Sequence, residues 1–184
     1  GAYRKLSEGV RALHEKDPAF RITGRTVIHR LNFRRWPAII DAAHDIGLDQ
    51  ISFLPADVTS EAFNRANPWD EPRQQEILPS KRELPEVMAV IEEIIQNYSP
   101  YFEKGFIAES PDKLRKIGQH YRASHGLGSY PYKRCNAPWV SVVVEADGTV
   151  RPCFFMPGMG NIRERSLMDI LNSPDAIDWR RNLD

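Results

Sequence analysis

The first third of the chain alternates between helical and strand-like spacing of its apolar residues. Apolar side chains recur every three or four positions over residues 3–13, which predicts an amphipathic helix. Residues 22–31 are rich in β-branched side chains and predict a strand. Helical spacing returns over residues 36–46, and the apolar run 51–54 predicts a second strand. The order helix, strand, helix, strand is typical of parallel βαβ construction.

The middle of the chain contains a stretch without periodicity, followed by helices with clear start signals. Residues 56–79 show no regular spacing and are expected to form a long loop of the kind that often contacts substrate. Ser80 and Glu83 have capping-box spacing ahead of a helical apolar stripe. Ser110, followed by a proline, predicts the start of a second helix. Ser166 and Ser173 are expected to open two short closing helices.

The only two cysteines of the chain, Cys135 and Cys153, flank a predicted β-hairpin. Asp147-Gly148 lies between two β-branched stretches, and Gly148 can supply the positive φ that a tight turn requires. Such a hairpin would bring Cys153 alongside Val142, close to where Cys135 enters the ribbon. Two neighbouring thiols are half of a metal or cluster site. The alternative is a pair of buried or free thiols, or a disulfide.

The spacing within this segment resembles a known family. Twelve residues separate Cys135 from Gly148 and four separate Gly148 from Cys153, and Gly160-Asn161-Ile162 precedes the predicted helix 166–172. This order is similar to the opening of the SPASM or twitch domain of radical S-adenosylmethionine enzymes, which binds an auxiliary iron–sulfur cluster. The resemblance implies that Cys135 and Cys153 ligate a [4Fe-4S] cluster in the parent protein.

The same resemblance implies an α/β fold with the C-terminal part of a partial (β/α)6 TIM-like barrel, followed by a small SPASM/twitch-like domain made of a β-hairpin plus helices. Residues 1–79 would be the distal half-barrel with its rim loop, 80–130 a helical linker, and 131–184 an incomplete auxiliary-cluster domain. Ligands of such folds lie beyond the carboxyl ends of the strands. Arg30, Asn32 and Leu54 are therefore expected to line the S-adenosylmethionine pocket, although Asn32 could instead cap the next helix.

Two departures from the family pattern change the functional expectation. The chain contains no CxxxCxxC triplet for a catalytic cluster and no cysteine after Cys153. We therefore expect a piece of a longer enzyme, lacking the N-terminal half-barrel and a C-terminal cysteine segment, that is not competent alone and binds no stable cluster. In the parent, S-adenosylmethionine would yield a 5′-deoxyadenosyl radical that attacks a peptide, protein or small molecule; the catalytic residues are unknown. The exposed edge of strand 22–31 favours a dimer of the isolated chain.

Composition excludes several other classes of protein. The 25 basic and 25 acidic residues cancel, so no overall field favours nucleic acid or anionic lipid. No apolar run approaches the roughly 20 residues that span a bilayer. Two cysteines in 184 residues do not make a secreted disulfide framework, which favours the cytoplasm. The alternative function is a non-catalytic α/β module that docks a peptide or partner protein along the strand edge of the ribbon.

Overall fold

A computed structural model describes residues 1–60, 67–131 and 135–182 of the chain. The chain divides into two compact units. The first unit comprises residues 1–58 and 69–131, and the second comprises residues 59–68 and 132–184.

The first unit is built on a parallel pair of strands. Strand β1 (Thr23–Ile28) pairs with β2 (Gln50–Pro55) in parallel, in register from Thr23↔Gln50 to Ile28↔Pro55. The crossover between them contains the short 3-10 helix η1 (Phe33–Arg35) and α2 (Trp36–Asp45). On the other edge of β2, Ile51 forms a parallel bridge with Ile107. The predicted βαβ unit is confirmed, and residue 107 adds a contact that the apolar pattern did not indicate.

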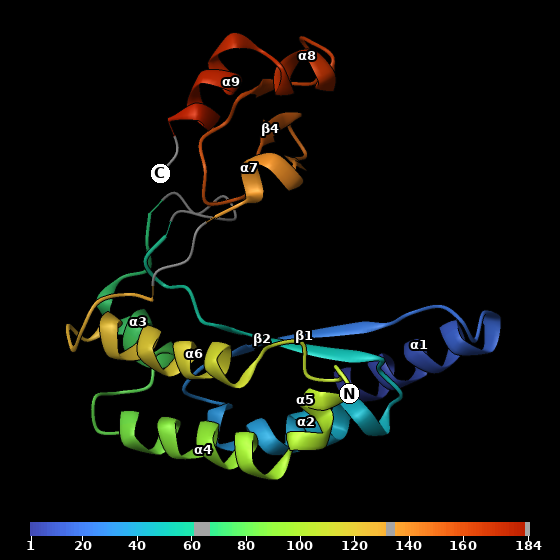
Figure 1. Ribbon diagram of the computed structural model, residues 1–184, viewed down its shortest axis with the longest axis vertical. Coiled ribbons are helices and arrows are strands. Elements are labelled where there is room, and N and C mark those ends of the chain that lie inside the picture. The colour runs from blue at the N-terminus through green and yellow to red at the C-terminus, as the bar shows by residue number, and fades with distance from the viewer. Residues whose placement is uncertain (61–66, 132–134, 183–184) are drawn as a thin grey trace. The chain divides into compact units, whose positions relative to one another are not determined.

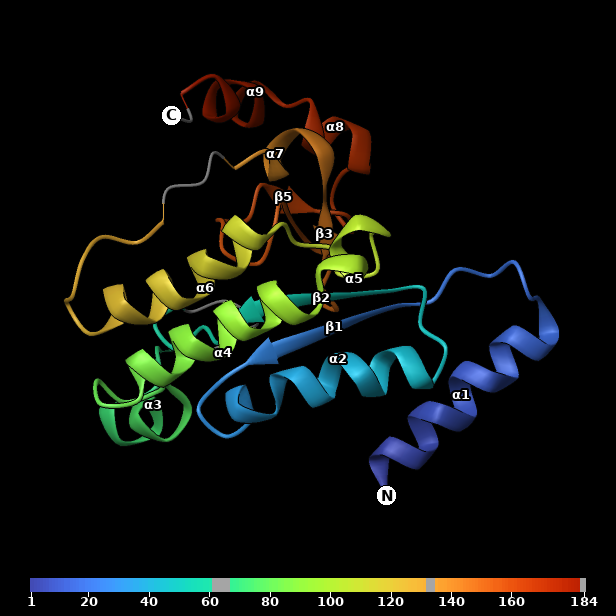
Figure 2. The same ribbon diagram turned by 60° about the horizontal axis from the view of Figure 1, so that its bottom comes forward.

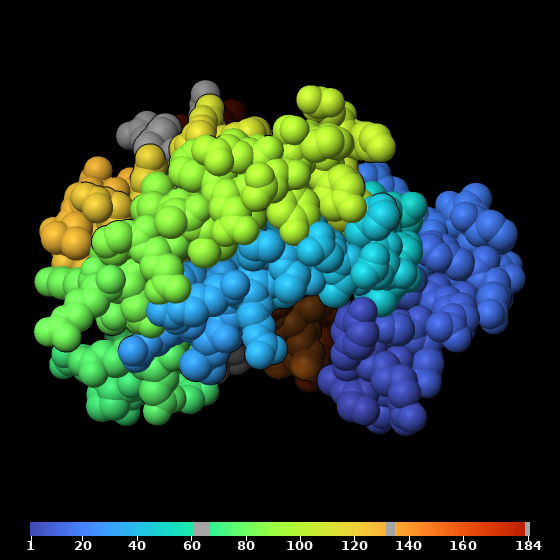
Figure 3. Space-filling model, turned by 90° about the horizontal axis from the view of Figure 1, so that it is seen from below, coloured from blue at the N-terminus to red at the C-terminus, as the bar shows by residue number. Residues whose placement is uncertain are grey.

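Helices cover one face of these strands. Helix α4 (Leu84–Asn97) packs against α2, and α6 (Pro111–Ser124) packs against both α4 and β2. Figure 1 shows α2 and α4 on the same side of the strands, and Figure 2 shows α4 and α6 side by side. Seen from that side, α2 and α4 form much of the surface of this unit (Figure 3). The largest fully buried side chains of its core are Trp36, Tyr121, Phe33, Phe53, Ile28, Ile40, Ile51, Ile91, Ile94 and Leu114.

Residues 80–130 belong to this same core rather than forming a separate linker. Gly118 lets α4 and α6 approach closely, because a Cβ at that position would require the Met88 side chain to shift. Ser110 caps α6 through a hydrogen bond from the Lys113 N–H, as predicted. Helix α4 begins at Leu84, later than the Ser80 signal suggested.

Two short α-helices of the first unit were not expected from the sequence. Helix α3 (Glu71–Ile77) lies within the stretch predicted to be a loop, and Asp70 caps it by accepting a hydrogen bond from the Arg73 N–H at 3.0 Å. Asp at the N-cap with proline in the first turn is a recognised helix signal. Seven residues are too short to show periodicity, so this capping signal was the available one. Helix α5 (Ser99–Glu103) follows α4 directly.

The N-terminal helix α1 (Ala2–Lys16) confirms the predicted amphipathic stripe, although much of the stripe is open to solvent. Val10 is buried, whereas Tyr3 and Leu6 are 56% and 54% exposed. An exposed apolar stripe of this kind contributes little to the stability of the unit, because burial is what stabilises a short helix.

The second unit is small and dominated by turns. Helix α7 (Ala137–Val140) leads into β3 (Val143–Val144), β4 (Thr149–Arg151) and β5 (Gly160–Asn161), which form an antiparallel sheet in that order. The closing helices α8 (Leu167–Leu171) and α9 (Pro174–Arg181) follow. Ser166 and Ser173 cap them through hydrogen bonds from the N–H groups of Asp169 and Ala176, as predicted. Among the described residues of this unit, the buried hydrophobic side chains are Val150, Ile170 and Ala176.

Candidate iron–sulfur ligand site

The hairpin between the two cysteines has a three-residue loop. The Gly148 N–H donates to the Glu145 carbonyl at 2.9 Å, and the Glu145 N–H donates to the Thr149 carbonyl at 2.9 Å. Residues 146–148 therefore form the loop, and Gly148 lies in the left-handed region with φ +90°. This is the arrangement of a turn closed by a bulge glycine. The hairpin and the requirement for positive φ at Gly148 are both confirmed.

The register of the hairpin differs by one residue from the predicted one. A two-residue turn at Asp147-Gly148 would place Cys153 opposite Val142. The observed pairs are Val143↔Arg151 and Val144↔Val150. Extending this register by two residues places Ser141, and not Val142, opposite Cys153. The difference arises because the loop takes in Ala146, and loop length fixes the register of a hairpin.

The segment that follows Cys135 is a helical turn before it becomes a strand. The Ser141 N–H donates to the Ala137 carbonyl at 2.9 Å, and the Trp139 N–H donates to the Asn136 carbonyl at 3.0 Å. The proline at position 138 suits the first turn of a helix. The apolar run predicted as a strand over 140–144 is therefore extended only in its second half, and Cys135 lies two residues ahead of α7.

Both cysteines are free thiols; Cys135 is exposed and Cys153 is half-buried. No disulfide joins them. Within the described ranges, no group of three or more His, Cys, Asp or Glu residues is placed to hold a metal ion. Thiolates are the ligands that iron–sulfur clusters use, but a four-iron cluster takes four of them. The chain therefore fits two ligand positions of such a cluster and does not fit a complete site.

The Gly-Asn-Ile motif fastens the hairpin loop. Asn161 donates from Nδ2 to the Asp147 carbonyl at 3.0 Å, and the Ile162 N–H donates to the Gly148 carbonyl at 2.9 Å. A Cβ on Gly148 would lie 2.5 Å from the Asn161 Oδ1 atom, so the two residues can pack only if position 148 is glycine. The motif thus has a structural role in the hairpin that precedes Cys153, independent of any ligand.

An ion pair supports the strand that leads to Cys153. The Arg151 guanidinium pairs with the Glu145 carboxylate across the hairpin and also donates to the Met156 carbonyl at 3.1 Å. The Met156 N–H in turn donates to the Cys153 carbonyl at 3.2 Å. These contacts hold the loop after Cys153 against the ribbon.

In the first unit, Asn32 is occupied by the turn that follows β1. Its Oδ1 accepts a hydrogen bond from the His29 N–H at 2.8 Å, and its Nδ2 donates to the Val27 carbonyl at 2.9 Å. The side chain makes no capping bond to η1. Asn32 therefore shapes the exit of the strand, and its contact with a cofactor stays a prediction.

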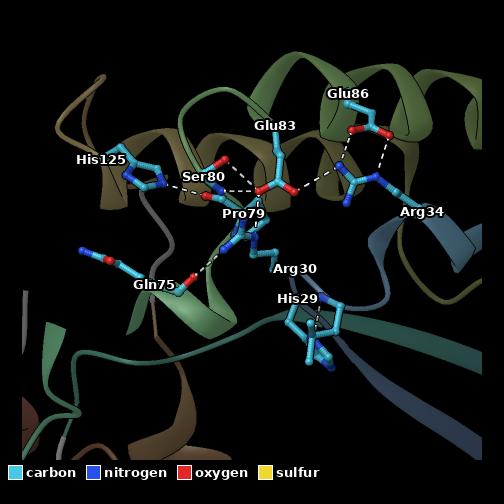
Figure 4. Close-up of polar contacts among 10 residues, drawn as sticks. His29, Arg30, Arg34, Gln75, Pro79, Ser80, Glu83, Glu86 and His125 are labelled. Carbon is cyan, nitrogen blue, oxygen red and sulfur yellow. Dashed lines mark hydrogen bonds and ion pairs between the residues drawn. The ribbon is translucent and has the colours of Figure 1, made fainter. Parts of the chain in front are cut away.

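Arg30 is part of a polar network at the same strand end (Figure 4). Its guanidinium lies 2.9 Å from the Glu83 carboxylate and donates to the Gln75 carbonyl at 3.1 Å. Burial raises the pKa of the Glu83 carboxyl, but hydrogen bonds from the Ser80 N–H and hydroxyl and from Arg34, with the charge of Arg30, outweigh it and lower the pKa to about 2. The network ties the loop after β1 to the start of α4. Cofactor binding by Arg30 stays a prediction.

Leu54 lies on the face of the strands away from the covering helices. It is 41% exposed, and its register partner Val27 is 45% exposed. The buried residues Ile51 and Phe53 alternate with it on the opposite face. Of the three residues predicted to line a cofactor pocket, Leu54 is the one whose side chain lies on an uncovered apolar surface.

Two residues at the carboxyl ends of the strands were missed by sequence reasoning. The buried Tyr121 hydroxyl donates to the Ile28 carbonyl and accepts from the Ala56 N–H at 2.9 Å, which fastens β1 to β2. Burial lowers the pKa of neighbouring His120, against the opposing effects of a hydrogen bond with the Ala56 backbone and the charge of Asp57. Both side chains come from α6, and no local pattern links that helix to the distant strand ends.

Comparison with known protein families supports the family resemblance of the cysteine segment. Residues 135–184 match the SPASM family, described as an iron–sulfur cluster-binding domain. The match begins at Cys135 and includes all described elements from α7 to α9. No curated protein matches the chain. None of the described helices is long and apolar enough to cross a membrane.

Proposed function

We propose that Cys135 and Cys153 supply two ligands of an auxiliary [4Fe-4S] cluster in a radical S-adenosylmethionine enzyme of the cytoplasm. The observation that carries this proposal is the family match starting at Cys135, combined with a hairpin whose register leads back to Cys153. The remaining ligands would come from cysteines elsewhere in the same polypeptide, since this chain has two. When bound, such a cluster supplies one-electron redox chemistry. Cys135 and Cys153 would supply two of its thiolate ligands, and the hairpin would hold Cys153 in place.

The first unit would form the distal strands of the (β/α)6 half-barrel of that enzyme. Its parallel β1–β2 pair, with helices on one face, supports this assignment. The missing N-terminal half-barrel would pair with the outer edge of β1, which has no partner strand among the described residues. S-adenosylmethionine would lie against Leu54 at the strand ends that Arg30 and Asn32 hold in place. The substrate class would be a peptide, protein or small molecule.

Anaerobic treatment of the reduced chain with iron and sulfide tests the ligand assignment. We expect labile iron uptake that depends on both cysteines and disappears in Cys135→Ser and Cys153→Ser. A chromophore with four irons per chain that survives gel filtration would contradict the assignment of only two cluster ligands to this chain. Iron uptake unchanged in both serine variants would contradict ligation by these cysteines.

A second candidate function rests on the open edge of the ribbon. In an antiparallel ladder the hydrogen-bonded pairs alternate, so the backbone groups of Val144 point away from β4 toward the edge of the sheet. Trp139, Val140 and Val142 are exposed nearby and line a groove with Leu171. An extended apolar peptide could add a strand there. Titration with an alternating Val-Thr hexapeptide should shift the amide NMR signals of Val143 and Glu145, which flank Val144, in the original chain. It should leave these two signals unchanged in a Val144→Pro variant, because proline cannot donate the backbone hydrogen bond.

A further inference from the structure

One side chain joins the two segments that carry the cysteines. The Ser141 Oγ atom lies 2.8 Å from the Pro152 carbonyl and 3.0 Å from the Ala137 carbonyl. A hydroxyl has a single proton, which these two acceptors share. Pro152 immediately precedes Cys153, and Ala137 lies two residues after Cys135. The Ser141 hydroxyl therefore links the backbone shortly after Cys135 to the backbone just before Cys153.

The backbone ladder of the hairpin does not extend as far as this hydroxyl. The last described pair is Val143↔Arg151. Two residues further, the Ser141 N–H would be the group that continues the ladder to Cys153. It donates to the Ala137 carbonyl instead, because the chain turns into α7 at this point. The Ser141 side chain thus makes a hydrogen bond to the segment after β4 at a position where the backbone ladder has ended.

We propose that Ser141 is a positioning residue that sets the approach of the Cys135 and Cys153 sulfur atoms to a shared metal or cluster. This inference rests on the proposed function of the two cysteines. Helix α7 has four residues, and a single turn is not stable without outside contacts. The hydrogen bond to the Pro152 carbonyl anchors that turn against β4. Removing an outer hydrogen bond that orients metal ligands typically weakens metal binding by about 10- to 100-fold.

Cadmium titration of the reduced chain tests this role, read by the ultraviolet absorbance of sulfur-to-cadmium charge transfer. Ser141→Thr and Ser141→Val have the same shape but differ in the hydroxyl. We expect Thr to bind cadmium as the original chain does, and Val and Ala to bind roughly tenfold more weakly. Ser141 is exposed, and amide NMR spectra of the three variants check that each one folds.

Ser166→Ala is the matched control, since it removes a hydroxyl that caps α8 in the same unit and is not bonded to either cysteine segment. It should keep the original cadmium affinity. Equal affinity of Ser141→Thr and Ser141→Val, or an equal loss in Ser166→Ala, would overturn the positioning role. The proposed function fails in a different way, if Cys135→Ser and Cys153→Ser leave the charge-transfer band unchanged.

Discussion

The two units of the molecule are stabilised by different kinds of interaction. The first unit buries large apolar side chains from strands and helices in one continuous core. The second buries Val150, Ile170 and Ala176 and depends otherwise on turns, caps and an ion pair. Burial of a side chain the size of valine or isoleucine contributes about 1.5–3 kcal/mol. Because Val150 and Ile170 are the largest buried aliphatic side chains described in the second unit, its reserve of stability is expected to be much smaller than that of the first unit.

The difference fits the chemistry proposed for each unit. Small domains with little core commonly need a metal or another staple to be stable. A cluster bound by Cys135 and Cys153 would contribute folding free energy to the second unit. The first unit needs no such contribution, so its strand ends can be shaped by side-chain hydrogen bonds alone.

The largest difference between the two units is expected when the same isoleucine-to-alanine substitution is made in each core. Ile91 and Ile170 are both fully buried, in the first and the second unit respectively. Replacing either by alanine costs about 2–5 kcal/mol. Ile170→Ala should abolish protection of the second unit from amide exchange, because that loss exceeds its reserve. Ile91→Ala should leave both units folded, with a lower urea midpoint.

Exchange measured peptide by peptide distinguishes the two outcomes. Loss of protection throughout the first unit in Ile170→Ala would show that the units unfold together. Protection of the second unit that survives Ile170→Ala would show that it is more stable than its core suggests. Either result would contradict the expected difference in stability between the two units.

A smaller effect is expected from glycine replacements. Gly148 and Gly105 both have positive φ, +90° and +71°, and belong to the second and first unit. A Cβ at Gly105 would have no atom within 4 Å, so Gly105→Ala should lower the free energy of unfolding only by the left-handed backbone strain, about 1 kcal/mol. Gly148→Ala should add the displacement of Asn161 to this strain, for a loss of about 2–3 kcal/mol in total. Urea unfolding of the two variants measures the difference, and equal losses would contradict the locking role of Asn161.

How much the sequence could predict also differs between the units. In the first, periodic apolar spacing predicted α1, α2, β1 and β2 and their parallel order, because burial on one face imposes that spacing. It could not predict that Arg30 would pair with Glu83 or that Tyr121 would join the strand ends. Those contacts depend on how distant elements pack.

In the second unit, motifs predicted more than periodicity did. The Asp147-Gly148 pair predicted the hairpin, and the serines predicted both closing helices. The register was predicted one residue away from the observed one, because the motif does not specify whether Ala146 belongs to the loop. That residue decides whether Ser141 or Val142 lies opposite Cys153, so the place of Cys153 in the hairpin could not be derived from spacing alone.

The smallest effect is expected from the protonation of one carboxylate of the first unit, Glu83. The Glu83 pKa lies at about 2 in the folded protein, below its ordinary value of 4.5. A lowered folded pKa means that the carboxylate stabilises the fold above its ordinary pKa and loses this contribution as the pH falls toward 2. Glu83→Gln should therefore cost about 1–2 kcal/mol at pH 7, and the cost should shrink steadily below pH 4.5.

Glu86→Gln provides the control, because Glu86 also pairs with Arg34 but is 47% exposed. An exposed pair contributes less than about 1 kcal/mol, so this variant should stay close to the original chain at every pH. Urea midpoints of the three proteins between pH 2 and pH 7 measure the effect. A Glu83→Gln cost that stays constant over this range would show that the network at the end of β1 stabilises the unit through shape rather than charge.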